Sequence, residues 1–207
     1  MSLYVEEKSG SGIAPLAEDT YPAVCYALID LGDQYSAAFD KYNRKVVIGW
    51  ELPGETLTIE GEEVPRTFWN TYTASLSQKA QLRKDLTSWR GKEFTAEELK
   101  GFNLRNIVGV PCMIQIVHRK SADGTKTYAN LASVTKLPKG FQAPKGTLKP
   151  LIYDIEESDP AMVEELPQWM QDKIKASNNY QYHVAELQKK PRLREIPDDE
   201  DDGELPF

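Results

Sequence analysis

Short apolar runs separated by turn-forming residues recur along the first part of the chain. Residues 21–31 (YPAVCYALIDL) are rich in aliphatic and aromatic side chains and stop at a Gly-Asp pair, which predicts a strand followed by a turn. Residues 46–52 (VVIGWEL), closed by Pro-Gly, predict a second strand, and residues 66–73 (RTFWNTYT) predict a third after an acidic loop. We expect residues 32–45 to form a loop between the first two strands.

The spacing of apolar residues changes after the third predicted strand. From residue 77 to residue 89 they recur mainly at steps of three and four, with polar residues between them, which predicts an amphipathic helix that ends at Gly91. A short second helix is predicted over residues 96–100, because Thr95 can cap its start and acids follow in the first turn. A helical segment of about residues 75–100 therefore follows the three strands.

Strands are predicted to return in residues 111–119 and 126–137. The segment between them contains Asp123-Gly124, which is a strong signal for a β-hairpin. The resulting order matches the OB-fold, a five-stranded, partly open Greek-key barrel. The predicted fold class is therefore mainly β, an OB-fold barrel with a helical insert between its third and fourth strands. SH3-like barrels would not need an insert of this length.

The C-terminal part of the chain has a different pattern. Residues 142–149 contain proline and glycine and predict a linker, and a helix is predicted near residues 166–174, with Met170 and Ile174 on one face. Trp169 and this helix are a candidate homodimer interface. From Pro191 onward aromatic residues vanish until the last position and acids dominate, which predicts disorder. The predicted organisation is a flexible segment at 1–20, a barrel domain at 21–141, a linker and helical extension at 142–190, and a disordered acidic tail at 191–207.

The net charge of -7 hides an uneven distribution. Residues 66–149 hold 15 Lys and Arg against 5 Asp and Glu, whereas residues 151–207 hold 6 against 15. A basic body joined to an acidic end is typical of a protein that binds a polyanion and keeps a separate anionic segment for other contacts. A lysine-rich solvated surface is the alternative interpretation of the same distribution.

Several other function classes find no support in the sequence. The start of the chain lacks the basic and apolar regions of a signal peptide, and no stretch approaches the roughly 18 apolar residues of a membrane span, so we expect a cytoplasmic protein. Cys25 and Cys112 lie in apolar runs and are expected to be buried thiols without a disulfide. Because metal-ligand spacings, phosphate-binding loops and catalytic motifs are missing, we expect no metal, no cofactor and no enzyme activity.

Two predicted loops combine aromatic and cationic residues. In an OB-fold these loops, between strands one and two and between strands four and five, close over an oligonucleotide on the face of strands two and three. Exposed rings stack on bases for roughly 1–3 kcal/mol each, and neighbouring cations neutralise phosphates. The candidate DNA-binding residues are Tyr35, Phe39, Lys41, Tyr42, Arg44 and Lys45 around the first loop, and Arg119, Lys120, Lys126 and Tyr128 around the second.

The strands between these loops contribute further candidates. Period-two alternation places Trp50 with the aliphatic residues of the second strand, so it is predicted to be a core residue. Phe68 and Tyr72 share one face of the third strand and Trp69 lies on the other; Arg66, Phe68 and Tyr72 are candidate DNA-binding residues. Stacking and phosphate neutralisation are indifferent to base sequence, and no motif for reading duplex DNA is present. Single strands are therefore the expected ligand.

The segments YPAVCYALIDLG, KVVIGWELP, GVPCMIQIVHR and ADGTKTYANLASV resemble those of the OB-fold single-stranded DNA-binding proteins of tailed bacteriophages and prophages. The segment LPQWMQDKI is similar to one that follows the barrel in related phage proteins. The ending DDEDDGELPF resembles the acidic tip of bacterial single-stranded DNA-binding proteins, where Pro-Phe enters a basic-rimmed apolar pocket on partners. This tip departs from the common bacterial version by carrying Glu204-Leu205 before Pro206.

The resemblance implies sequence-nonspecific binding of single-stranded DNA in phage replication or recombination, inside a bacterial host. It also implies that the tip recruits replication or recombination proteins, through the candidate partner-binding residues Asp201, Asp202, Glu204, Leu205, Pro206 and Phe207. Three alternatives remain open. They are a single-strand annealing or recombination-mediator protein, an OB-containing nuclease subunit, and a protein-interaction module whose acidic tail occupies its own groove.

Overall fold

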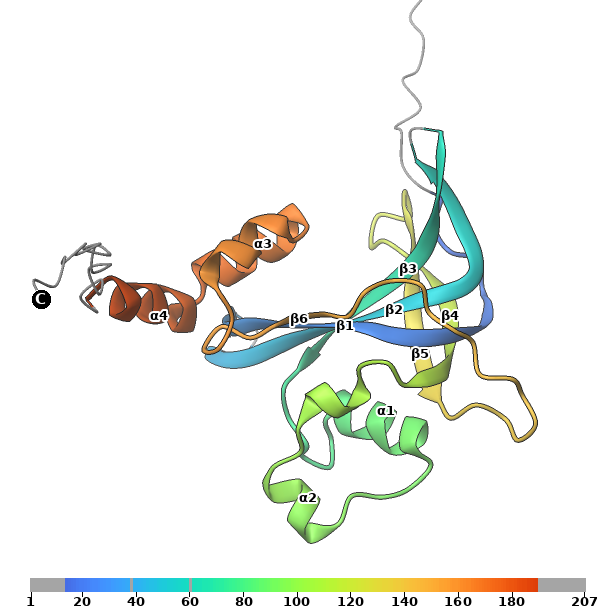
Figure 1. The fold of residues 1–207 in the computed structure, drawn as a ribbon, viewed down its shortest axis with the longest axis horizontal. Helices are drawn as coiled ribbons and strands as arrows, with labels where there is room; N and C mark the ends of the chain where they lie inside the picture. Colours follow the sequence, from blue (N-terminus) through green and yellow to red (C-terminus); the bar gives the residue numbers. More distant parts are fainter. Residues whose placement is uncertain (1–13, 38, 60, 190–207) are drawn as a thin grey trace, which may run out of the picture.

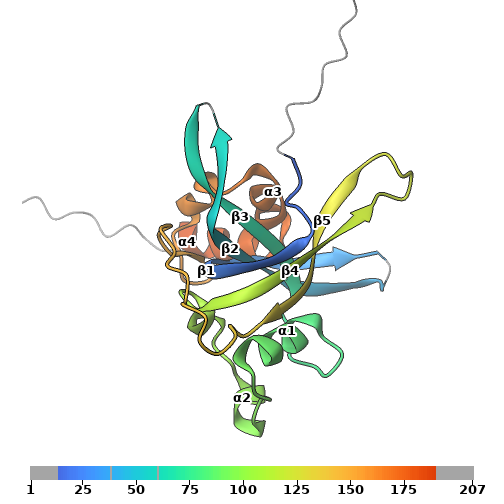
Figure 2. The ribbon, with the colours of Figure 1, turned by 90° about the vertical axis from the view of Figure 1, so that its right-hand side faces the viewer.

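The computed structural model describes residues 14–37, 39–59 and 61–189, which form a mainly β structure with a few helices (Figure 1). Five antiparallel strands lie in the order β3-β2-β1-β4-β5, and a short β6 pairs in parallel with β1. The strands are β1 (Asp19–Ser36), β2 (Lys41–Ile59), β3 (Glu62–Thr73), β4 (Pro111–Lys120), β5 (Thr127–Thr135) and β6 (Leu151–Tyr153). The described strands β3 and β5 end the sheet and are not paired with each other, so the sheet curls without closing (Figure 2).

Helices occur in two places. Between β3 and β4 lie α1 (Gln81–Arg90), α2 (Ala96–Lys100) and the 3-10 turn η1 (Leu104–Ile107), which confirms the predicted helical insert. Gly91 ends α1 in the left-handed region at φ 66°, and Thr95 and Glu98 form a capping box at the start of α2, both as the sequence indicates. After β6 follow η2 (Pro160–Glu165), α3 (Gln168–Ala176) and α4 (Asn178–Lys189).

The expected loop over residues 32–45 is wrong, because β1 and β2 continue as a long hairpin. Backbone pairing runs from Gly32 opposite Lys45 to Ser36 opposite Lys41. Gly32 adopts φ +70° at a register shift rather than in a turn, and an added Cβ there would lie 2.5 Å from Ser177 Oγ. The glycine therefore marks a bulge and a close approach to the α3–α4 junction, while the ladder hydrogen bonds carry the strands onward.

The expected acidic loop before the third strand is also part of a hairpin. Pairing between β2 and β3 resumes at Thr56 opposite Pro65 and runs to Ile59 opposite Glu62. The Pro-Gly pair that was expected to end the second strand lies in the register shift between Leu52 and Thr56. A bulge absorbs those residues, so the strand extends past them.

Buried apolar side chains form a cluster on each face of β1 and β2. The larger one, inside the curl, contains Trp50, as predicted, together with Trp89 of α1 at 6.1 Å between ring centroids. Cys25 and Cys112 are also buried there as free thiols, which confirms the prediction, and burial raises the pKa of Cys25 to about 12. The second cluster, on the outer face, joins β1 and β2 to the C-terminal helices.

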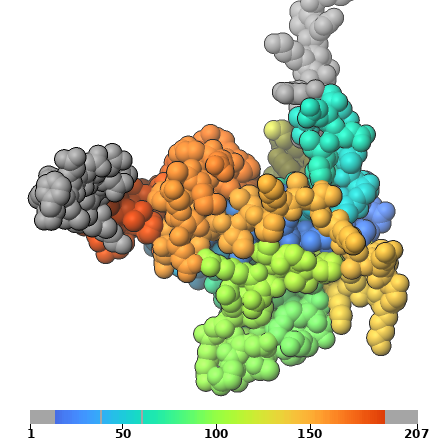
Figure 3. Space-filling view, viewed as in Figure 1, coloured from blue at the N-terminus to red at the C-terminus, as the bar shows by residue number. Residues whose placement is uncertain are grey.

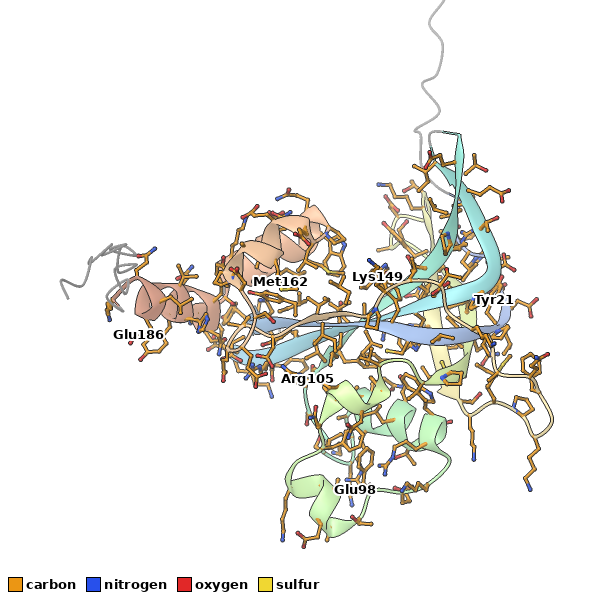
Figure 4. All side chains as sticks on the ribbon, in the orientation of Figure 1. Tyr21, Glu98, Arg105, Lys149, Met162 and Glu186 are labelled. Carbon is orange, nitrogen blue, oxygen red and sulfur yellow. The ribbon has the colours of Figure 1, made fainter. Side chains whose placement is uncertain are left out.

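The C-terminal segment packs against the outer face of the sheet (Figure 3). Met170 and Ile174 of α3 are fully buried, as their spacing predicts, and Met162, labelled in Figure 4, packs against the same cluster. The predicted linker contains no helix or strand at residues 142–149, but it is not loose. The buried Glu51 carboxylate accepts hydrogen bonds from Thr147 N, Thr147 Oγ1 and Leu148 N at 2.7–2.9 Å.

Candidate nucleic-acid interface

The tip of the β1–β2 hairpin carries three exposed rings. Tyr35 and Tyr42 face each other across the ladder, with ring centroids 5.3 Å apart and exposures of 55% and 58%. Tyr35 Oη donates a hydrogen bond to Asp40 Oδ1 at 2.7 Å, and Asp40 makes the turn at φ 48°. Phe39 is 72% exposed, with Lys41 Nζ 5.7 Å from its ring centroid. Rings held in place and left uncovered by the protein are suited to stacking on bases.

The cations at the base of this hairpin are engaged within the protein. Arg44 binds Asp30 at 2.7 Å and Glu156 at 3.3 Å, and hydrogen bonding to Asp30 raises the pKa of its guanidinium. Lys45 donates to Thr73 Oγ1 at 2.7 Å. Of the three cations predicted here, Lys41 is therefore the one that projects from the tip, while Arg44 and Lys45 have structural partners.

The β4–β5 hairpin places its predicted residues at an exposed turn. Arg119, Lys120 and Lys126 are exposed, and Tyr128, opposite Arg119 in the ladder, has 52% of its surface open. Asp123 orders the turn, since it accepts hydrogen bonds from Ser121 Oγ and Thr125 N that lower its pKa to about 2. In Figure 2 this hairpin and the β1–β2 hairpin both project to the right, whereas Figure 1 shows the β1–β2 hairpin extending to the left, toward α4.

The third strand contributes less than the sequence predicts. Phe68 and Tyr72 face inward and Trp69 outward, so their predicted opposition is correct. The prediction that Tyr72 contacts DNA is wrong, because its ring is 3% exposed and its hydroxyl donates to the buried Asp85 at 2.8 Å. Phe68 is partly buried against the inner cluster, and Arg66 donates to the carbonyl of Ala14 at 2.6 Å.

The face of strands two and three, expected to hold the ligand, is largely covered on its outer side. Val47 lies in the cluster shared with the C-terminal helices, and Glu51 binds residues 147–148. The Trp69 ring lies across Gly49 so closely that a Cβ there would be 2.7 Å from Cζ3. The chain's own C-terminal segment thus occupies much of this face, and the hairpin tips are what it leaves open.

The excess positive charge of residues 66–149 lies mostly outside ion pairs. Three of its cations are paired: Arg90 with Glu98, Lys100 with Glu97, and Arg105 with Asp154 and Glu157. The other cations of this segment have no carboxylate partner among the described residues. Several of them, such as Lys84 and Lys136, gather at α1, a site that sequence reasoning missed although the charge count was its signal.

A scan against models of known protein families gave no match, and a search of curated protein sequences gave none.

The described residues do not form a metal site or a membrane-spanning helix. Across residues 14–37, 39–59 and 61–189, no group of three or more His, Cys, Asp or Glu side chains is arranged to hold a metal ion. None of the helices that the structure describes is long and apolar enough to cross a membrane. The candidate partner-binding residues, Asp201, Asp202, Glu204, Leu205, Pro206 and Phe207, lie outside the described residues.

Proposed function

We propose that this protein binds single-stranded DNA without reading its sequence, through the tips of the β1–β2 and β4–β5 hairpins. We further propose that the curled sheet is an OB-fold. Its strand order β3-β2-β1-β4-β5, with a helical insert between β3 and β4, supports that assignment, because the five-stranded Greek-key barrel has this connectivity.

The observation that carries the proposal is the set of rings at the hairpin tips. Tyr35, Phe39, Tyr42 and Tyr128 are each more than half exposed. Rings buried this little contribute less to stability than core rings do, whereas each is worth roughly 1–3 kcal/mol when a base stacks on it. Every base has an aromatic face, so such contacts favour unpaired strands over duplex DNA.

Cations beside the rings are placed to bind the phosphates of the DNA strand. Lys41 at one tip, and Arg119, Lys120 and Lys126 at the other, are exposed and have no carboxylate partner in the described part of the chain. Neutralising phosphates releases counterions, so binding weakens as salt rises, with a log–log slope of about −0.7 per phosphate on single strands. The acidic C-terminal segment and the final residues Pro206 and Phe207 are proposed to recruit replication or recombination proteins.

The proposal is tested by fluorescence anisotropy with labelled single-stranded DNA, duplex DNA and RNA. The parent protein is expected to prefer single strands, and Phe39→Ala and Tyr42→Ala are each expected to weaken binding roughly 5- to 150-fold. Phe141→Ala is the matched control, since Phe141 is 46% exposed and lies after β5, outside both hairpins. Absence of single-strand binding at low salt would refute the proposal, and degradation of the oligonucleotide with divalent metal would favour a nuclease.

A further inference from the structure

Exposed lysines surround the outer side of α1. Figure 1 shows that this helix lies below the sheet, apart from the hairpin tips. A solvent-open hollow of about 520 Å³ lies there, lined by Gln78, Arg83, Lys84, Thr87, Ser88 and Glu93. Lys136, which follows β5, borders it: its backbone N donates to Ser88 O at 3.3 Å, and its Cδ lies 3.2 Å from where a Cβ on Gly91 would be. The chain thus brings cations from two distant segments to one place.

These cations have no structural task that the contacts reveal. Lys84, Lys92 and Lys136 are exposed, and none of them forms an ion pair with a described residue. The exposed Glu93 also lines the hollow, and Glu98 pairs with Arg90. Asp85 is buried and engaged by Tyr72 and Gln81, so the exposed charge here remains positive on balance. Like charges gathered on one surface repel each other, which costs stability unless a polyanion compensates them.

The strand β5 connects this surface to the β4–β5 tip. It starts at Thr127 beside the tip cations and ends at Thr135, one residue before Lys136. One of its edges pairs with β4, while its other edge pairs with no described strand, and Figure 2 shows it running from the hairpin down to α1. Its nine residues span about 30 Å at roughly 3.4 Å per residue.

We propose that the bound DNA strand continues from the β4–β5 tip along the free edge of β5 to α1, where Lys84, Lys92 and Lys136 bind its phosphates. This inference rests on the proposed function and extends it by a binding track. A single phosphate or nucleotide would span a small part of the distance between the two groups of cations. A polyanion can contact the cations of the β4–β5 tip and those at α1 at the same time.

The track predicts that the α1 lysines matter only for long oligonucleotides. The triple variant Lys84→Gln, Lys92→Gln, Lys136→Gln is compared with the parent on oligodeoxynucleotides of about 4 and about 16 nucleotides, the limits of site size for one OB-fold. For the long one, affinity is expected to fall about tenfold or more at low salt, and the salt slope to decrease in magnitude by about 2. Affinity for the short one is expected to stay unchanged.

A control variant with the same charge change, Lys100→Gln, Lys149→Gln, Lys189→Gln, removes exposed lysines outside both hairpins and α1 and is expected to behave like the parent. Measuring the mass of the complex in solution checks that one protein molecule binds each long oligonucleotide. If the triple variant binds the long oligonucleotide with the affinity and salt dependence of the parent, the track is refuted, but the proposed binding at the hairpin tips is not. Equal losses of affinity for both oligonucleotides would also refute the track. A parent protein that binds neither oligonucleotide would refute the proposed function as well.

Discussion

Arg44 and Asp30 are joined by two hydrogen bonds, of 2.7 and 3.2 Å, at the base of the β1–β2 hairpin. Asp30 is 7% exposed and also accepts the backbone N–H of Gly32 at 3.0 Å. Arg44 reaches Glu156 as well, so this pair ties the hairpin to the segment that follows β6. The exposed rings at the tip therefore stand on a fixed base rather than on a free ribbon.

Removing the carboxylate at this base is expected to destabilise the protein. Asp30→Ala leaves the Gly32 N–H and much of Arg44 without their partner, and the free energy of unfolding is expected to fall by about 2 kcal/mol, since hydrogen bonds to charged groups are worth roughly 1.5–3 kcal/mol. Urea unfolding of the parent and of Asp30→Ala measures this difference in the free energy of unfolding. Glu97→Ala, which removes an exposed pair with Lys100, is the control and should change stability by less than about 1 kcal/mol.

Glu51 is expected to make stability depend on pH. Burial alone would raise the pKa of its carboxyl, but hydrogen bonds from Leu148 and Thr147 outweigh burial and lower it. A carboxyl group whose pKa is lower in the folded than in the unfolded protein stabilises the fold at pH values above its unfolded-state pKa of about 4.3. This stabilisation is lost as the pH falls through the folded-state pKa. Glu51→Gln is thus expected to cost about 2 kcal/mol at pH ~7 and progressively less under acid conditions.

Limited trypsin digestion provides a second readout for Glu51. Lys145 lies two residues before Thr147 and is followed by glycine, so Glu51→Gln should speed cleavage after Lys145, whereas Lys149 is protected by Pro150. An unchanged cleavage rate, or a stability difference that stays constant with pH, would show that the carboxylate does not fasten this segment.

Two glycines with nearly equal positive φ angles are expected to respond differently to a methyl group. Gly32 and Gly124 have φ of +70° and +71°, but a Cβ on Gly32 would meet Ser177 Oγ at 2.5 Å whereas nothing lies within 4 Å of one on Gly124. Gly124→Ala should cost about 1 kcal/mol from the left-handed backbone alone. Gly32→Ala should cost about 1–3 kcal/mol more because of overpacking, measured by thermal unfolding. Equal losses would contradict this packing.

Substituting a core tyrosine is expected to change protein stability, whereas substituting a tip tyrosine is expected to change DNA affinity. Tyr72→Phe removes the hydroxyl that donates to buried Asp85 and should lower the free energy of unfolding by about 1–3 kcal/mol, with DNA affinity unchanged. Tyr42→Ala should weaken DNA binding with little effect on unfolding, because its ring is 58% exposed. Parallel measurements of unfolding and anisotropy on both variants test this. Reduced DNA affinity in a folded Tyr72→Phe protein would contradict the assignment.

Local patterns along the chain were sufficient for the central parts of the five main strands and for α1, α2 and α3, but not for β6 or α4. The runs that contain Trp50 and Cys112 predicted buried strands, Gly91 and Thr95 marked helix boundaries, and the Asp-Gly pair predicted the β4–β5 hairpin. These features depend on backbone preferences and on burial of one face, which are properties of neighbouring residues. The strand ends were harder, because Gly32 looks the same in sequence whether it ends a strand or bulges within one.

The sequence by itself therefore determined where the five main strands and α1, α2 and α3 are centred, which aromatic residues could lie at the tips, and where positive charge is in excess. Only the tertiary structure decided that Arg44 binds Asp30 and Glu156, that Glu51 holds residues 147–148, and that Tyr72 points at Asp85. Each of these contacts joins residues far apart in the chain. Their distances depend on how the whole sheet curls, and no local spacing of residue types encodes that geometry.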